Sequence, residues 1–518
     1  MKRKLLLAFL ILAPVLLIQL PAINRPIFGH FASYQGTVMG GIAQNMVREH
    51  FSELLLPKTN LIFGTGRSLH LNQYPLPSLL AALGNSFAGG TMEFWGRLQA
   101  IIFNLITIAL MGLIARRLWA GMGWQTAALF AFSPFSLIYG QSFLSEAAGL
   151  CFLMAALYLL LASETSRQKL ILTICSALLF SLAITSRIHF AVTYFIFFYC
   201  LITSEKRSWA QWMIFSFLGF LLPTAWYAHT YFTGLGSDHL HTNFFVQMFS
   251  PGNVTKGQIF TNLDYYKRLF DLISLNVLTP MLFPFFLIGL FIMPFKERSS
   301  RIVYLGVAMG LLLIVLAPQK LLEHDFYLYG VFPFLMLAAS FGLQHLWKGF
   351  EANRLKWAVF VFFFLYLVVS ARYFVNPLFK YPSEAHRVVS LGQKIQQLTG
   401  PDEEISMVGP FAPELAFYTN RPVRMLDFTK LGQGIPAFMK NSRFSRVNLD
   451  YVAKFEAAMT DPITWVEFFR TEGSFYLVST NKETIDQIPG LLAHLKQNDE
   501  ELSTAEDDYY LFRLNAHV

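Results

Sequence analysis

The sequence predicts an α-helical polytopic membrane protein with about 11 transmembrane helices and a C-terminal extracytoplasmic α/β domain. Of its 518 residues, 54% are hydrophobic and only 14% are charged, whereas soluble domains usually carry about 25% charge. Apolar runs near the ~20 residues that a helix needs to cross a bilayer recur as far as residue 374. Residues 376–518 differ, with 14 Lys or Arg and 19 Asp or Glu.

The first apolar run, residues 5–23, follows three basic residues, so a cleaved signal peptide is the alternative to a first span. Leu20 to Arg25 fit a small-residue cleavage site poorly, and we therefore expect a retained span. The remaining predicted spans are 98–115, 122–140, 146–162, 169–186, 188–203, 209–229, 275–294, 302–318, 327–346 and 355–374.

Charge in the short connections predicts the orientation. With a cytoplasmic N-terminus, the connections on that side hold fifteen Lys or Arg and four Asp or Glu, as the positive-inside rule describes. An odd number of spans then places the tail outside, together with the loops 24–97 and 230–274. We expect a multi-pass inner (plasma) membrane protein, in which the net charge of +8 reflects topology and no nucleic acid is bound.

The predicted domains are a membrane domain, 1–375, and an extracytoplasmic α/β domain, 376–518. In the second domain the alternating segments 403–409, 422–426, 474–480 and 509–514 predict strands. The amphipathic segments 383–398 and 483–495 predict helices.

The first outer loop begins with RPIFGHFASYQG (25–36), which contains histidine, tyrosine and glutamine but no carboxylate. The following TVMGGIAQNMVREHF has helical periodicity and is expected to lie along the membrane surface. NQYPLPSLLAAL (72–83) has two prolines just before an apolar helix. The alternative to a binding loop is a re-entrant or interfacial structure packed on the spans.

Glu146 is the only charge in GQSFLSEAAGL (140–150), between the third and fourth spans. An ionisable group at the mouth of a hydrophobic helix is costly to desolvate and is a functional candidate. The alternative is a carboxylate that the helix dipole favours at the N-terminus, with Ser145 as the cap.

SRIHF (186–190) places Arg187 and His189 at the outer end of the fifth span, where positive charge is disfavoured. The arginine either reaches lipid phosphates or binds a phosphate ligand. LLEHDFYLYGVFPF (321–334) gathers a second polar group at the start of the tenth span. On a helix, Asp325 and Tyr329 share one face and His324 and Tyr327 another, which favours a ligand-facing cluster over an interfacial tyrosine belt.

Other chemistries find little support. Asp238, His239 and His241 in the second long loop match no strong zinc signature. Cys151, Cys175 and Cys200 lie in apolar runs, as small core residues do, and predict neither a disulfide nor a metal site. The sequence has no phosphate loop, dinucleotide fingerprint, HExxH or GxSxG motif, which argues against a nucleotide-driven pump.

Several short motifs together resemble the C-type membrane glycosyltransferases, in particular bacterial relatives of the protein O-mannosyltransferases and the lipid A aminoarabinose transferases. In chain order these are AQNM (43–46), YPLP (74–77), GRL (96–98), the SP…GQ…SE run (133–146), LAITSR (182–187), HDFYLYGVFPF (324–334) and PELAFYTNRPV (413–423).

The resemblance implies transfer of a sugar from a polyprenyl-phosphate donor to a lipid, glycan or protein acceptor of the cell envelope, such as lipopolysaccharide, normally with inversion. Many relatives carry an acid in the first outer loop that acts as the base, but Gln35 and Gly36 occupy those positions here. His30, Tyr34 and Gln35 match a histidine and glutamine pattern of other bacterial members. The candidate bases are therefore Glu146, His30 and Asp325.

The predicted substrate-binding residues are Tyr34, Gln35, Tyr74, Arg187, His324 and Tyr327. No cofactor is required and no metal ligand is assigned, although Asp325 could share a divalent cation with the phosphate. Two rival hypotheses are a transporter or flippase of a lipid-linked glycan, and a noncatalytic relative that binds lipid-linked sugar. The lack of an internal repeat speaks against the transporter.

Overall fold

The computed structural model describes residues 2–28, 31–62, 67–204, 209–236, 261–349, 353–375, 383–409, 412–426, 453–454, 457–458 and 460–515. The chain forms two compact units. Unit 1 comprises residues 1–25, 97–227 and 254–380, and unit 2 comprises 26–96, 228–253 and 381–518. His30, Asp238, His239 and His241 lie outside the described residues.

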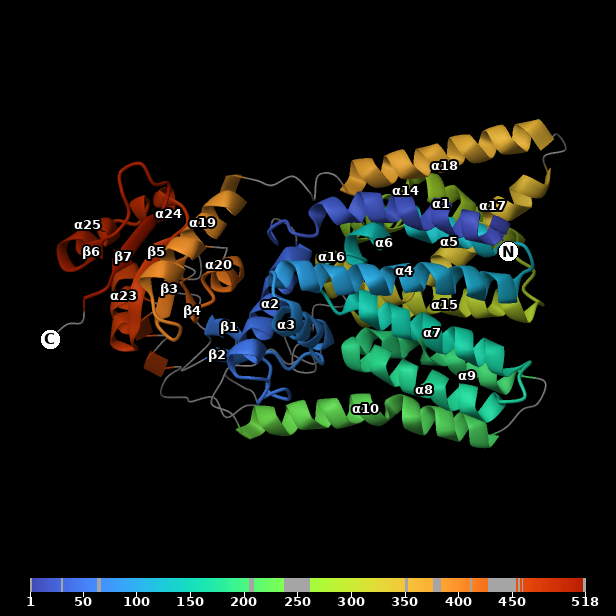
Figure 1. Cartoon of the computed structure of the whole chain (residues 1–518), viewed down its shortest axis with the longest axis horizontal. Coiled ribbons are helices and arrows are strands. Elements are labelled where there is room, and N and C mark those ends of the chain that lie inside the picture. Colours follow the sequence, from blue (N-terminus) through green and yellow to red (C-terminus); the bar gives the residue numbers. More distant parts are fainter. Residues whose placement is uncertain are drawn as a thin grey trace. The chain divides into compact units, whose positions relative to one another are not determined.

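Unit 1 is built from helices (Figure 1). Its α-helices, two of which extend into unit 2, are α1 (Lys2–Gln19), α4 (Met92–Leu118), α5 (Gly123–Phe132), α6 (Pro134–Tyr139), α7 (Glu146–Ser163), α8 (Lys169–Ser186), α9 (Tyr194–Ile202), α10 (Trp209–Gly236), α13 (Leu263–Asp271), α14 (Thr279–Ile292), α15 (Arg298–Leu316), α16 (Pro318–Glu323), α17 (Phe332–Gly349) and α18 (Asn353–Val375). Shorter turns are η1 (Leu20–Ala22), η2 (Ile188–Thr193), the π-helical η4 (Leu272–Val277) and η5 (Asp325–Gly330).

Each predicted span coincides with helical structure, and some spans are broken. Among the described residues, four helices (α4, α7, α8 and α15) are long and apolar enough to cross a membrane. A bent pair, 263–277 with 279–292, makes a fifth if it is one span. The predicted span 122–140 divides into α5 and α6 because Pro134 has no amide hydrogen to continue the helix. A multi-pass membrane protein is therefore supported, and the number of eleven spans stays a prediction.

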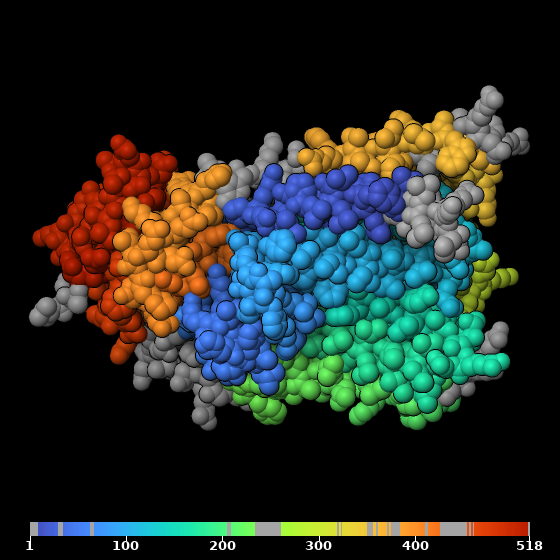
Figure 2. Space-filling model, in the orientation of Figure 1, coloured from blue at the N-terminus to red at the C-terminus, as the bar shows by residue number. Residues whose placement is uncertain are grey.

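The outward sides of these helices are apolar, as a lipid environment requires. Figure 2 shows one face of the molecule, on which α1, α4 and α7 are visible in blue to teal. Phe9 and Leu17 of α1 and Ile102 and Ile106 of α4 are exposed large apolar side chains. Such surfaces are costly in water and cost nothing against acyl chains.

Two glycines let α14 and α17 approach each other closely. A Cβ atom at Gly289 would lie 1.9 Å from the carbonyl oxygen of Ala338, and one at Gly342 would lie 2.1 Å from that of Phe285. Membrane helices commonly pack through small residues, since contact between them has no hydrophobic driving force.

Unit 2 contains one seven-stranded sheet with the order β2-β1-β4-β3-β5-β7-β6. The strands are β1 (Lys58–Ile62), β2 (Arg67–Leu69), β3 (Glu404–Val408), β4 (Val423–Leu426), β5 (Ser474–Ser479), β6 (Glu500–Glu501) and β7 (Tyr510–Arg513). The pairs β1–β4, β4–β3 and β3–β5 are parallel, and the other three pairs are antiparallel. All four predicted strands of the tail are confirmed. The sequence did not indicate that two strands of the first outer loop would extend the same sheet.

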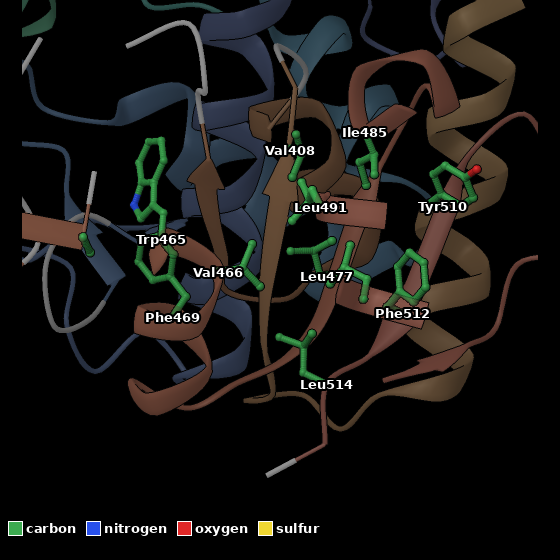
Figure 3. Close-up of a cluster of buried hydrophobic side chains, with 12 residues drawn as sticks. Val408, Trp465, Val466, Phe469, Leu477, Ile485, Leu491, Tyr510, Phe512 and Leu514 are labelled. Carbon is green, nitrogen blue, oxygen red and sulfur yellow. The ribbon is translucent and has the colours of Figure 1, made fainter. Parts of the chain in front are cut away.

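The helices of unit 2 are α2 (Phe31–Arg48), α3 (Leu76–Ala88), α19 (Ser383–Leu398), α20 (Ala412–Thr419), α23 (Pro462–Thr471), α24 (Lys482–Asp486) and α25 (Leu491–Asn498). The predicted helix 383–398 is confirmed by α19. The predicted helix 483–495 is two helices, because Gly490 takes a left-handed conformation (φ 78°) that only glycine adopts readily. A buried apolar cluster lies between β5, β7 and the three last helices (Figure 3).

Helix α2 joins the first outer loop to the rest of unit 2. Gln44 Nε2 donates to the Phe417 carbonyl (3.0 Å), and Asn45 Nδ2 donates to the Lys58 carbonyl (2.9 Å). Gly40 of α2 faces the ring of Phe417. The apolar residues of α2 (Val38, Met39, Ile42 and Met46) are buried against protein. Packing within unit 2 therefore accounts for the helical periodicity that we interpreted as a membrane-surface helix.

We expect Gly342→Val to destabilise the protein by about 1–3 kcal/mol, because the new side chain must displace backbone rather than a mobile side chain. Thermal unfolding in detergent measures the effect. Gly310→Ala is the control, since a Cβ there meets Val331 at an ordinary 3.4 Å. Equal melting temperatures for the two variants would contradict the close packing of α14 and α17.

Burial raises the pKa of Glu414 to about 7 from 4.5, and its Oε2 has no hydrogen-bond partner among the described residues. The folded state thus disfavours the charged carboxylate, so the free energy of unfolding falls as the pH rises from 4.5 to about 7. We expect Glu414→Gln to stabilise the protein by roughly 3 kcal/mol at pH 8 and hardly at all at pH 4. Exposed Glu506→Gln is the control. A pH-independent effect of Glu414→Gln on the melting temperature would refute this account.

Candidate functional site

Unit 1 brings several predicted site residues together near the ends of its helices. We call this group the polar cluster. Its members are Tyr139, Glu146, Arg187, His189, His324, Asp325, Phe326 and Tyr327.

Local structure places these residues at interruptions of the helices. Helix α8 ends at Ser186, and Arg187 takes an extended conformation (φ −154°, ψ 114°) before η2. His324 likewise leaves helical geometry (φ −142°, ψ 84°) before the 3₁₀ turn η5. Glu146 is the first residue of α7, where a carboxylate is favoured by the helix dipole. Backbone breaks of this kind point polar side chains into the protein and away from lipid.

An ion pair joins Glu146 to Arg187. Arg187 Nη2 lies 2.6 Å from Glu146 Oε1, and the two side chains are 11% and 0% exposed. Removing two charges from water costs several kcal/mol each, and their attraction offsets this cost only while both are present. The predicted functional carboxylate is therefore first of all the counter-ion of the predicted phosphate-binding arginine.

Aromatic rings surround the arginine. The Arg187 guanidinium lies over the ring of Phe326, 4.9 Å from its centre. His324 stacks on the same ring, with centres 5.5 Å apart and planes at 8°. His189 meets the ring of Tyr327 edge-on at 5.1 Å. These contacts fix the guanidinium through cation–π attraction and connect it to the segment 324–327.

A hydrogen bond from the Tyr139 hydroxyl to Asp325 Oδ1 connects the same segment to α6. In the same helix, the Ser136 hydroxyl donates to Asn104 Oδ1 of α4 at 3.1 Å. A Cβ atom at Gly140 would lie 2.3 Å from Asn104, so the close approach of these elements requires glycine there. Asp325 is thus oriented by a tyrosine that is itself fully buried.

The two carboxylates of the cluster differ in access. Glu146 is completely buried, whereas Asp325, His324 and Tyr327 are partly exposed. A group that takes a proton from a substrate must come within hydrogen-bond distance of it. By this criterion Asp325 is better placed as a base than Glu146.

Arg97, the arginine of the GRL motif, holds the start of the first outer loop. Its Nη1 donates to the carbonyl oxygen of Ala22 at 2.7 Å and also bonds those of Ile23 and Arg25. The guanidinium satisfies carbonyl groups that a chain leaving a helix cannot pair within the helix. The residues that precede RPIFGHFASYQG are thereby fixed to α4.

The remaining predicted residues belong to unit 2, apart from His30, which lies outside the described residues. Tyr34 and Gln35 lie near the start of α2, and Gln35 is partly buried. Tyr74 is partly buried in the loop before α3, and this burial raises the pKa of its hydroxyl. The placement of the units relative to each other is not described, so these residues are not assigned to the polar cluster.

Metal ligands are sparse in the described part of the chain, where no group of three His, Cys, Asp or Glu residues could hold an ion. In the polar cluster, Glu146 is engaged by Arg187 and Asp325 by Tyr139. These side chains alone do not make the closed ligand set of a structural metal site.

Two members of the cluster escaped the sequence analysis. Tyr139 ends an apolar run and Phe326 lies inside the HDFY motif, and in both places an aromatic residue is ordinarily core material. Their importance depends on contacts with Asp325 and Arg187, each more than 130 positions away in the chain. The only available signal was their position directly beside the GQ and HD motifs.

Comparisons with known proteins concern the fold of the chain. A family model described as dolichyl-phosphate-mannose-protein mannosyltransferase matches residues 72–228. The apo structure of ArnT from Cupriavidus metallidurans matches with a TM-score of 0.58 over 98% of this chain and 97% of ArnT, at 13% sequence identity. The chain has the fold of the C-type membrane glycosyltransferases. The resemblance predicted from the short motifs is thereby confirmed.

Two further solved structures share this glycosyltransferase fold. ArnT from Cupriavidus metallidurans bound to undecaprenyl phosphate has a TM-score of 0.56 at 13% identity and covers 97% of both chains. The oligosaccharyltransferase of Archaeoglobus fulgidus in complex with zinc and sulfate has a TM-score of 0.61 at 10% identity, over 91% of this chain and 67% of its own. No curated protein sequence matches the chain.

We expect Arg187→Met to destabilise unit 1 by about 3–5 kcal/mol, because it leaves the Glu146 carboxylate buried without its counter-ion. The double variant Glu146→Gln with Arg187→Met removes both charges and should recover most of that loss. Thermal unfolding in detergent of the two single variants and the double variant completes a double-mutant cycle. Additive losses would show that the ion pair contributes no coupling.

Proposed function

We propose that the protein is an inner-membrane glycosyltransferase that moves a sugar from a polyprenyl-phosphate donor to an acceptor of the cell envelope at the outer face of the membrane. The acceptor is a lipid, a glycan or a protein. The observation that carries the proposal is a largely buried arginine, Arg187, and an accessible, oriented carboxylate, Asp325, in one polar cluster of a chain with this glycosyltransferase fold. Binding of undecaprenyl phosphate by the similarly folded ArnT supports a lipid-linked donor.

Arg187 and His324 bind the donor phosphate in this proposal. Both side chains contact the Phe326 ring, which holds their nitrogen donors in fixed positions near each other for a phosphate to meet. Departure of a phosphate becomes easier when cations neutralise the charge that develops on it. The Glu146 carboxylate holds Arg187 in place before substrate arrives.

Asp325 acts as the base that takes the proton of the acceptor hydroxyl. As it loses its proton, the acceptor oxygen attacks the anomeric carbon from the side opposite the phosphate. The bond from that carbon to the phosphate oxygen breaks, and the configuration at the carbon is inverted. The bond to Tyr139 holds the Asp325 carboxylate in a fixed orientation. Among the candidate bases that the structure describes, Asp325 therefore ranks before Glu146, and His30 is retained as the first-loop alternative.

The first outer loop contributes polar contacts to the substrates. His30, Tyr34, Gln35 and Tyr74 offer hydrogen-bond donors and acceptors without adding negative charge near an anionic donor. Arg97 anchors the chain segment that leads into this loop. A divalent cation shared by Asp325 and the phosphate is compatible with these side chains, and the proposed chemistry does not depend on it.

The lack of a carboxylate in RPIFGHFASYQG favours a second candidate function, a noncatalytic relative that binds a lipid-linked sugar. Both candidates require donor binding at Arg187, and only the transferase requires Asp325. A panel of radiolabelled polyprenyl-phosphate sugars, tested with and without envelope acceptors, separates binding from transfer.

For the transferase we expect Asp325→Asn to reduce kcat by about 10²–10⁴-fold, the usual contribution of a general base, with donor binding retained. The measurement is sugar transfer by purified protein in detergent. Asp271→Asn is the matched control, because Asp271 lies at the end of α13, outside the polar cluster. Full activity of Asp325→Asn would remove Asp325 from the chemistry, and donor binding without transfer to any acceptor would favour the noncatalytic relative.

A further inference from the structure

Helix α13 and the π-helical η4 meet α14 at a sharp bend. The segment Leu263–Val277 makes an angle of 102° with Thr279–Ile292. Pro280 accounts for the break, because proline has no amide hydrogen to continue a helix and disfavours helical geometry in the residue before it. That residue, Thr279, takes a left-handed conformation (φ 63°). With α14 crossing the bilayer as part of the predicted span 275–294, α13 runs nearly along the membrane plane.

One side of α13 exposes large apolar side chains. Leu263, Tyr266 and Phe270 are 81%, 47% and 56% exposed. Their spacing of three and four residues places them on the same side of the helix. Tyr265 and Leu272 lie on a different side and are buried against the protein. The exposed apolar side is therefore in addition to the side by which the helix packs on unit 1.

The charged residues occupy a third side of α13. They are also three or four positions apart, and two are acidic and two basic: Asp264, Lys267, Arg268 and Asp271. The helix thus has no net charge. A helix whose apolar and charged sides are separated in this way is typical of the membrane–water interface, where tyrosine is also common.

The exposed apolar side of α13 continues onto α14. The ring of Phe270 meets that of Phe283 edge-on, with centres 5.4 Å apart. Phe283, Leu287 and Phe291 follow one another at intervals of four residues along one side of α14, and the last two are exposed. In a membrane protein this side of α14 faces acyl chains, so the same lipid covers Phe270.

The length of α14 agrees with this position. Its 14 residues extend over about 21 Å, which is less than the ~30 Å of a hydrocarbon core. A helix this short brings the segment that adjoins it close to the ends of the acyl chains.

We propose that α13 is an in-plane helix whose partner is the lipid of the membrane interface. Leu263, Tyr266 and Phe270 lie among the acyl chains near the glycerol groups, and the charged side faces the headgroups and water. The end of the predicted outer loop 230–274 is thereby attached to the bilayer surface. This inference does not rest on the proposed glycosyltransferase activity.

The balance of charge on α13 predicts which lipids it contacts. Segments that recognise anionic lipids carry an excess of lysine and arginine. In α13, Asp264 and Asp271 offset Lys267 and Arg268, so burial of apolar surface drives the contact. Phosphatidylcholine should therefore serve as well as a mixture that contains phosphatidylglycerol.

Photolabelling of the full chain in phosphatidylcholine nanodiscs that hold one copy tests the proposal, because no second copy is present to cover α13. Phosphatidylcholine with a diazirine near its glycerol is activated by light, and peptide mass spectrometry locates the label. We expect similar labelling of Leu263, Tyr266 and Phe270, since residues along an in-plane helix lie at one depth. Leu311 of α15 is 60% exposed and serves as the internal standard for lipid contact.

Two variants locate the contact on one side of the helix. Phe270→Glu places a charge on the apolar side and should abolish labelling of Leu263 and Tyr266 while Leu311 stays labelled. Exposed Arg268→Glu is the matched control on the charged side and should leave the labelling of α13 intact.

Absence of label from α13 in a protein whose Leu311 is labelled would overturn the proposal, because water or protein would then cover its apolar side. A steep change in labelling from Leu263 to Phe270 would contradict the in-plane orientation. Labelling that requires added phosphatidylglycerol, or that the two variants reduce equally, would contradict a contact driven by the apolar side.

Discussion

The ion pair between Glu146 and Arg187 constrains the arrangement of the polar cluster. A charged arginine in the interior of a membrane domain is expensive, and a carboxylate 2.6 Å away is what makes it tolerable. The pair holds Arg187 at the end of α8, where its guanidinium lies over Phe326 of η5, and His324, just before η5, stacks on the same ring. The position of Asp325 follows, because the next residue, Phe326, lies under the guanidinium and Tyr139 bonds Asp325 itself.

This arrangement gives the carboxylates of Glu146 and Asp325 different roles. Glu146 is buried and balances charge, so its contribution to a reaction would be indirect. Asp325 is oriented by a neutral tyrosine and retains access, which suits a group that exchanges a proton with a substrate. The absence of an acid from RPIFGHFASYQG (25–36) is therefore compatible with catalysis. In the proposed mechanism, the role that a loop acid plays in relatives moves to the segment before α17.

The sequence predicted the helices and strands better than the contacts between them. The apolar runs and the four tail strands were found because hydrophobic periodicity is a local property. The motifs also indicated Glu146, Arg187 and Asp325. The pairing of β1 with β4 joins residues more than 350 positions apart and has no local signal. The hydrogen bond between Tyr139 and Asp325 could not be predicted for the same reason. The periodicity of α2 was interpreted as a membrane-surface helix because the protein surface against which α2 packs was unknown.

A structure of the protein bound to a polyprenyl-phosphate sugar tests the central claim most directly. The account predicts that the donor phosphate lies within hydrogen-bond distance of Arg187, and that Asp325 is the carboxylate nearest the face of the anomeric carbon opposite the phosphate. A phosphate bound away from Arg187, or a first-loop side chain such as His30 at the attacking face with Asp325 remote from it, would contradict the account.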